Sequence, residues 1–130
     1  MAVDADDPAT FTRGLPAPLA ADIAALITRY AAIGGWRRVE ARLDVTRGVP
    51  CPRFHVDRVA SRLLCTYRGR GTQWLEDPDD PDAIGELGTG DVAIMKGSVH
   101  ADGATALPHR SPPWSGADGP RILLVVDGHA

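Results

Sequence analysis

The segment CPRFHVD, residues 51–57, contains two side chains that could bind a metal ion. His55 and Asp57 are two positions apart, and on a β-strand residues at that spacing point to the same face. His109 lies in the later segment LPHRSPPW, and Arg121 begins the apolar run RILLVVD twelve residues after it. Two imidazoles and one carboxylate on one face of a barrel form the facial triad that binds Fe(II) and leaves coordination positions open. A guanidinium in the same barrel can bind a carboxylate in bidentate fashion. We therefore predict that His55, Asp57 and His109 hold a metal and that Arg121 binds a carboxylate.

Each of these residues also has an interpretation that needs no metal. His55 and Asp57 could form a hydrogen-bonded pair at the end of a strand, and His109 could be a loop residue beside the Pro-rich turn that follows it. Arg121 could pair with an aspartate at a strand edge. Arg110 directly follows His109 and is a second candidate for the carboxylate-binding residue.

Other residues that could carry chemistry give weaker patterns. His100 and Asp102 form a second His-x-Asp pair in KGSVHADG, but the flanking glycines predict a loop. Cys51 lies four residues before His55, a spacing that a zinc site could use, yet no second cysteine pair accompanies it, so we expect no structural zinc knuckle. Cys65, inside RLLCTY, is expected to be a small buried residue. The sequence contains neither a phosphate-binding loop nor a GxSxG nucleophile turn.

The elements that must position these side chains are one helix and a series of short strands. The run PAPLAADIAALITRYAAIGG, residues 16–35, has apolar residues at spacings of three and four, Pro18 in its first turn and two glycines at its end. RVEARLDV then alternates apolar and polar residues, as a half-buried strand does. Further short strands are expected, between Gly- and Pro-rich turns, at 54–57, 62–67, 73–75, 91–95, 105–107 and 121–126. One helix followed by short strands predicts a mainly β protein, an antiparallel barrel or sandwich. We expect a flexible arm over residues 1–16 and a single domain over residues 17–130.

The strand at 62–67 leaves one question open. If it alternates, Arg62 and Thr66 share one face and Tyr67 lies on the other, and either face could line a pocket. Arg62, Thr66 and Tyr67 are therefore all possible pocket-lining residues, and Trp74 is another.

The composition argues against several classes of partner. The chain of 130 residues has a net charge of −3, and its 14 Lys and Arg residues are scattered, so we expect neither nucleic-acid nor membrane binding. The acidic start MAVDADDPAT lacks the apolar core of a secretory signal, and no apolar run approaches the roughly 20 residues of a membrane span. With two cysteines and no signal, we expect reduced thiols and a cytoplasmic location.

The arrangement of these motifs resembles that of the double-stranded β-helix oxygenases that use Fe(II) and 2-oxoglutarate, over roughly residues 51–127. In those proteins a His-x-Asp pair opens the jelly roll, as in CPRFHVD, and an apolar strand follows, as RLLCTY does here. A Gly-Asp-apolar strand such as GDVAIM precedes the distal histidine, and a basic residue follows it, as in HRSPPWSGADGPRILLV. The resemblance implies a jelly-roll or cupin-like fold, with Fe(II) held by His55, Asp57 and His109. It also implies that 2-oxoglutarate binds to Arg121, or alternatively to Arg110.

A closer resemblance is to a bacterial family known as domain of unknown function 1826. The segments CPRFHVDRVASRLLCTYRGRGTQWL, GDVAIMKG and HRSPP carry it. The family more often has Gly-Pro-Gly-Thr where residues 69–72 are Gly-Arg-Gly-Thr, a change that touches no candidate ligand. Its members recur beside CobW-type metal-chaperone GTPases, which implies a functional link to metal supply.

Three functions follow as alternatives. The chain could be an Fe(II)- and 2-oxoglutarate-dependent oxygenase acting on an unknown substrate. It could instead be a non-catalytic Zn(II)-binding protein of metal homeostasis, since the same three ligands can hold zinc. Finally, the His-x-Asp pair could be purely structural.

Overall fold

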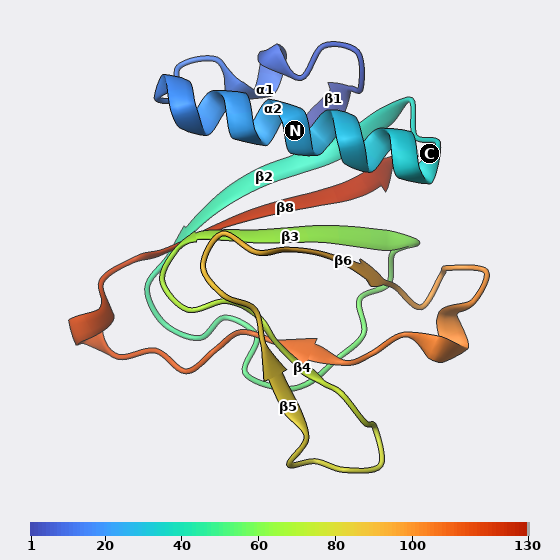
Figure 1. Ribbon diagram of the computed structural model, residues 1–130, viewed down its shortest axis with the longest axis vertical. Helices are drawn as coiled ribbons and strands as arrows, with labels where there is room; N and C mark the ends of the chain where they lie inside the picture. Colours follow the sequence, from blue (N-terminus) through green and yellow to red (C-terminus); the bar gives the residue numbers. More distant parts are fainter. Residues whose placement is uncertain (130) are drawn as a thin grey trace. The chain divides into compact units, whose positions relative to one another are not determined.

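A computed structural model describes residues 1–129 (Figure 1). It contains two α-helices and eight strands, with two short 3₁₀ helices in the loops. The helices are α1 (Ala9–Thr12) and α2 (Ala17–Gly34), and the 3₁₀ helices are η1 (Gly103–Thr105) and η2 (Gly116–Asp118). The strands are β1 (Ala2–Asp4), β2 (Arg38–Thr46), β3 (Ser61–Arg68), β4 (Gln73–Leu75), β5 (Ile84–Glu86), β6 (Val92–Lys96), β7 (His109–Arg110) and β8 (Arg121–His129). The protein is mainly β with one long helix near its N-terminus, as the sequence predicts.

The strands form two sheets. The larger has five strands in the order β1-β2-β8-β3-β6, and the smaller has three in the order β5-β4-β7. Pairing is antiparallel between β1 and β2, between β3 and β6, and between β4 and each of its neighbours. An isolated antiparallel bridge from His55 to His109 adds the segment around residue 55 to the smaller sheet, beside β7.

Contacts within the chain divide it into two units, which are described separately. The first comprises residues 1–42 together with the end of the chain from Val126. Its core contains one side of α2, where Ile23, Ile27 and Tyr30 are buried. The Tyr30 hydroxyl accepts a hydrogen bond of 2.8 Å from the Gly128 amide. The helix ends as predicted, because Gly35 takes a left-handed conformation with φ of 70°.

Two features of this unit differ from the sequence prediction. Residues 1–16, predicted as a loose arm, contain β1 and α1. A strand as short as β1 has no periodicity of its own and is defined by its pairing with β2, in which Val3 lies opposite Val39. In addition, the 18-residue helix α2 is long and apolar enough to cross a membrane, although a core helix of a soluble protein passes the same test.

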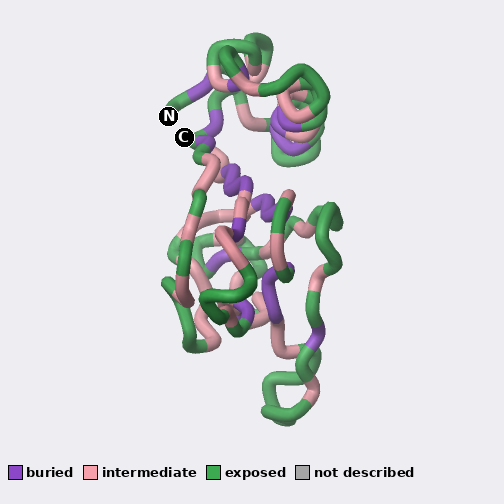
Figure 2. The backbone as a smooth tube through the Cα atoms, turned by 90° about the vertical axis from the view of Figure 1, so that its left-hand side faces the viewer, coloured by how far each residue is buried: buried purple, intermediate pink, exposed green. Residues whose placement is uncertain are grey.

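The second unit, Leu43–Val125, contains every residue predicted to carry chemistry. Its core lies along β3 and β8, where Leu63, Leu64, Cys65 and Leu124 are buried. Figure 2 shows buried stretches of the backbone between intermediate and exposed ones. The strands predicted at 62–67, 73–75, 91–95 and 121–126 are β3, β4, β6 and β8.

Two predicted strands of this unit are wrong. Residues 54–57 form only the single bridge at His55, because Pro50 and Pro52 interrupt the chain just before them. Residues 105–107 form no strand. There η1 ends at Thr105, whose hydroxyl donates a hydrogen bond of 2.9 Å to the Asp102 carbonyl, and such local bonds compete with strand formation.

Candidate metal centre

The two predicted histidine ligands lie side by side on neighbouring backbone segments. The His55 amide donates to the His109 carbonyl at 3.0 Å, and the His109 amide donates back at 2.9 Å. Directly opposed residues of an antiparallel pair point to the same face. The two imidazole rings accordingly lie with their centroids 4.7 Å apart and their planes tilted by 50°.

Asp57 completes the cluster. Its Oδ1 is 3.2 Å from His55 Nε2, and its Oδ2 is 2.9 Å from His109 Nε2. One donor atom from each of the three residues lies within 4.8 Å of the other two. The structure therefore brings together the three residues that the sequence singled out.

Burial leaves polar atoms of this cluster without hydrogen bonds. The side chain of His109 is 8% exposed and that of Asp57 is 15% exposed. Among the described residues, Asp57 Oδ2 and His109 Nδ1 are buried atoms with no partner in hydrogen-bond geometry. Asp57 Oδ2 nevertheless lies 2.9 Å from His109 Nε2 and from Arg62 Nη1, so its charge is partly compensated in the metal-free protein. Two imidazole nitrogens and a carboxylate oxygen facing one another thus fit a divalent metal ion.

Arg62 is a further member of the site. Its Nη1 lies 2.9 Å from Asp57 Oδ2. Burial raises the pKa of Asp57, but the polar contact from His109 and the charges of Arg62 and both histidines outweigh it and lower the pKa from 3.8 to about 2. The carboxylate is therefore ionised at neutral pH, as a metal ligand must be.

The backbone also orients His55. Its Nδ1 lies 2.8 Å from the Arg53 carbonyl oxygen, and since a carbonyl only accepts, Nδ1 is the protonated nitrogen in this contact. The other ring nitrogen, Nε2, faces Asp57. Metal-binding histidines commonly donate their other ring N–H to a backbone carbonyl in this way.

The structure shows which side chains of β3 point toward the candidate site residues. Arg62 contacts Asp57, and Thr66, four residues along the same face, contacts Arg121. Tyr67 lies on the opposite face by strand alternation and is half-buried. Trp74 is paired with His109 in the register of β4 and β7, so it shares the face of that ligand.

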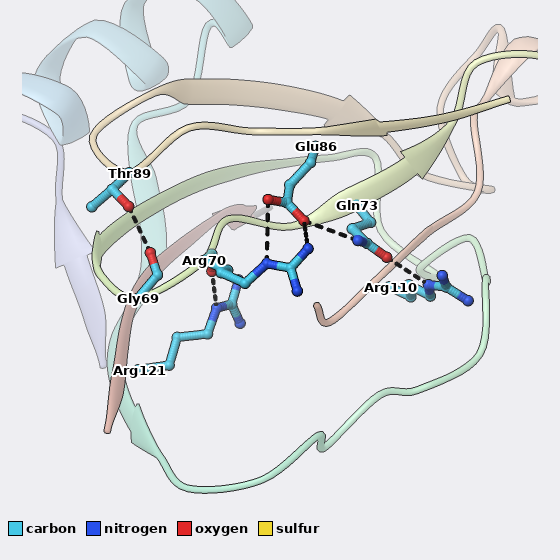
Figure 3. Close-up of polar contacts among 7 residues, drawn as sticks. All are labelled: Gly69, Arg70, Gln73, Glu86, Thr89, Arg110 and Arg121. Atoms are coloured by element: carbon cyan, nitrogen blue, oxygen red, sulfur yellow. Dashed lines mark hydrogen bonds and ion pairs between the residues drawn. The ribbon is translucent and has the colours of Figure 1, made fainter. Parts of the chain in front are cut away.

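Arg121 is a buried cation held by neutral groups. Its Nε donates to the Arg70 carbonyl at 2.8 Å (Figure 3), and its Nη2 donates to the hydroxyls of Thr72 at 3.1 Å and Thr66 at 3.3 Å. The residue is 5% exposed. Burial lowers the pKa of Arg121, and the charge of Asp44 partly offsets this.

Arg121 also lines a cavity of about 390 Å³ formed by the loops that follow β3, β5 and β7. The three clustered ligands do not line this cavity. Its walls are Gly69, Arg70, Gly71, Glu86, Leu87, Gly88, Thr89, Pro112, Pro113, Trp114, Asp118, Gly119 and Arg121.

The remaining candidates lie away from the cluster. Arg110 is on the other face of β7 from the His109 ring, where its Nε donates to Gln73 Oε1 at 2.9 Å. Asp102, of the second His-x-Asp pair, accepts from Lys96 Nζ at 2.9 Å. The Asp102 amide in turn donates to His100 Nδ1 at 3.0 Å. The sequence did not predict that Arg62 contacts Asp57, and only the choice of inward face on β3 would have revealed it.

Comparison with known proteins identifies the family. The family model described as "Protein of unknown function (DUF1826)" matches residues 7–127. The chain belongs to the DUF1826 family. No curated protein matches the sequence. Among solved structures, the DUF1826 chain is similar to one titled "Crystal Structure of Fe(II)-HppE with alternative substrate (S)-1-HPP", with 17% identity and a TM-score of 0.43. The match covers 69% of this chain and 41% of that one, so the chain spans about two fifths of its length.

Proposed function

We propose that the protein is an Fe(II)- and 2-oxoglutarate-dependent oxygenase with a double-stranded β-helix fold. The strand order supports the fold. When the segment at His55 is counted as a strand, the sheets become β2-β8-β3-β6 and β5-β4-β7-His55, with β1 added at the edge of the first. Apart from the β4–β5 hairpin, consecutive strands from β2 to β8 lie in different sheets, which is the arrangement of a jelly roll.

The ligand set supports the choice of metal. His55 Nε2, His109 Nε2 and a carboxylate oxygen of Asp57 are the donors that a non-haem Fe(II) oxygenase uses. Fe(II) held there would supply oxygen activation, while the chain supplies geometry and exclusion of water. Arg62 and the Arg53 carbonyl act on the ligands themselves, because Arg62 holds Asp57 ionised and the carbonyl orients the His55 ring.

Arg121 supports the choice of cosubstrate. The buried Arg121 guanidinium donates its hydrogen bonds to neutral oxygens, and an anionic ligand would compensate the burial of its charge. Nε and Nη2 donate to Arg70, Thr66 and Thr72, which fixes the plane of the guanidinium and leaves Nη1 to donate to a carboxylate.

The observation that carries the proposal is that one face of β3 serves both groups. Arg62 on this face contacts Asp57 and Thr66 contacts Arg121. Four residues along a strand span about 13 Å. A ligand that joins the metal site to Arg121 would therefore lie along this face of β3.

The experiment is anaerobic addition of Fe(II) and 2-oxoglutarate to metal-free protein, followed by visible absorption. We expect a weak charge-transfer band in the wild type and none in Arg121→Ala, although Arg121→Ala still binds iron. Arg58→Ala removes an exposed arginine next to Asp57 and should keep the band. Absence of the band in folded wild-type protein would contradict the proposal.

The alternative function uses the same ligands. Zn(II) binds imidazole and carboxylate donors and outcompetes Fe(II) by affinity order, so supply decides between the two metals. Protein purified without added metal that contains zinc, and that shows no 2-oxoglutarate-dependent band with Fe(II), would favour a non-catalytic metal-handling protein. Such a role would suit the expected link to CobW-type GTPases.

A further inference from the structure

The back of the two ligand-bearing segments carries a contact between an arginine and an aromatic ring. Phe54 and Arg110 each neighbour a predicted ligand in sequence. Since His55 and His109 point to one face, Phe54 and Arg110 point to the other. There the Arg110 guanidinium carbon lies 4.2 Å from the centre of the Phe54 ring, a cation–π distance.

A chain of polar contacts fixes Arg110 from its other side (Figure 3). Arg110 Nε donates to Gln73 Oε1 at 2.9 Å, and Gln73 Nε2 donates to Glu86 Oε1 at 2.9 Å. Arg70 Nη2 donates to the same Glu86 oxygen at 2.6 Å. Gln73 is buried, and both ends of its amide are used, so its orientation is defined. Arg110 is therefore held in one place on the sheet.

The segment that carries His55 needs such support. It pairs with β7 through only one bridge, which consists of the two hydrogen bonds between His55 and His109. One further backbone bond, from the Ser111 amide to the Cys51 carbonyl, lies beyond it at 2.9 Å. A regular ladder would fix the register over several residues, whereas a single bridge opens easily. Metal ligands must hold their positions to within about 0.5 Å.

We propose that Arg110 is a positioning residue for the metal site. Its planar guanidinium covers Phe54 and keeps the segment around His55 against β7, so that the two imidazoles stay opposed. Lysine cannot replace it fully, because lysine has neither the Nε donor for Gln73 nor a flat group to stack on the ring. The inference rests on the proposed metal-binding role of His55 and His109.

The test combines metal affinity with hydrogen exchange. Co(II) is titrated into metal-free protein and followed by its visible bands, and amide exchange at His55 and His109 is measured without metal. Arg110→Gln should weaken Co(II) binding by about 10- to 100-fold, as loss of a supporting contact commonly does. It should also speed exchange at both amides at least about tenfold and leave the amides of β3 unchanged. Arg110→Lys should fall between Arg110→Gln and the wild type.

Two further variants separate this role from a loss of charge or of general stability. Arg58→Gln removes the same charge from an exposed position beside Asp57 and should behave as wild type. Phe54→Leu should match Arg110→Gln. The double variant should add no further loss in Co(II) affinity, because both single changes break the same contact.

The outcomes are distinguishable. Unchanged Co(II) affinity and unchanged exchange in Arg110→Gln would overturn the proposal, and so would faster exchange throughout β3, which would indicate general destabilisation. If the wild type binds no Co(II), the proposed function fails. The positional role of Arg110 is then decided by exchange at His55 and His109 alone.

Discussion

Replacing Asp57 by asparagine in the metal-free protein should remove a stabilising, pH-dependent contribution. The carboxylate is placed beside Arg62 and His109, and its pKa is lowered from 3.8 to about 2 in the folded protein. Each pKa unit corresponds to about 1.4 kcal/mol, so the ionised carboxylate contributes about 2 kcal/mol to the free energy of unfolding at pH 7. Because the folded-state pKa lies below the unfolded value, this contribution is present above pH 4 to 5 and is lost as the pH falls toward 2.

The assay is urea unfolding of EDTA-treated wild type and Asp57→Asn between pH 7 and pH 3. We expect the wild type to be more stable by about 2 kcal/mol at pH 7 and by about 1 kcal/mol at pH 3. Asp79→Asn, in the exposed acidic loop, is the control and should leave the difference from wild type near zero at every pH. Parallel curves for wild type and Asp57→Asn across this range would refute the reasoning that Arg62 and His109 hold the ionised carboxylate.

Three further predictions concern metal, cosubstrate and packing. His109→Ala should lose bound metal, whereas His100→Ala should retain it, as measured by elemental analysis of dialysed protein; equal metal content in the two would count against the ligand assignment. Arg121→Gln should weaken 2-oxoglutarate binding to the Fe(II)-loaded protein by at least about tenfold in calorimetry, because a charge-assisted hydrogen bond is lost; wild-type affinity would show that the carboxylate binds elsewhere. Gly97→Ala should lower the unfolding temperature, with a loss of about 1–3 kcal/mol. A Cβ there would collide with the Val59 carbonyl and lie 2.8 Å from the Asp57 carbonyl oxygen. An unchanged melting curve would show that the backbone of this turn can shift to accommodate the methyl group at little cost.

Long elements with a regular pattern of apolar residues could be predicted from the sequence. The helix α2 has an apolar stripe over 18 residues and ends at a glycine that takes a left-handed conformation. The strand β2 alternates polar and apolar residues, and burial follows this alternation from Arg38 to Arg42, although Val45 near its end is exposed. In both cases a local pattern agrees with the tertiary packing, so propensity and burial point to the same element.

The short strands of the smaller sheet could not be predicted in the same way. β7 has two residues and β5 has three, and each exists because a partner lies beside it. The segment at His55 is held by one bridge, so the pattern that predicts a strand at 54–57 overestimates it. Pairing between distant segments is a tertiary property that local propensity does not contain.

In the candidate site, too, some residues could be predicted from the sequence and others could not. Residue types and spacing singled out His55, Asp57 and His109 because few chemistries use two imidazoles and a carboxylate together. The sequence could not show which face of β3 points toward the site. Leu63 and Leu64 lie on opposite faces of this central strand and both are buried, so the alternation of residue types does not distinguish the two faces.

The most direct measurement is a crystal structure of the native protein, purified without added metal, with anomalous diffraction at the iron and zinc edges. We predict an iron peak within about 2.3 Å of His55 Nε2, His109 Nε2 and a carboxylate oxygen of Asp57. A zinc peak there would keep the site but favour the metal-handling function. No peak at these residues, with Asp57 still 2.9 Å from His109 Nε2 and from Arg62 Nη1, would contradict the metal site altogether.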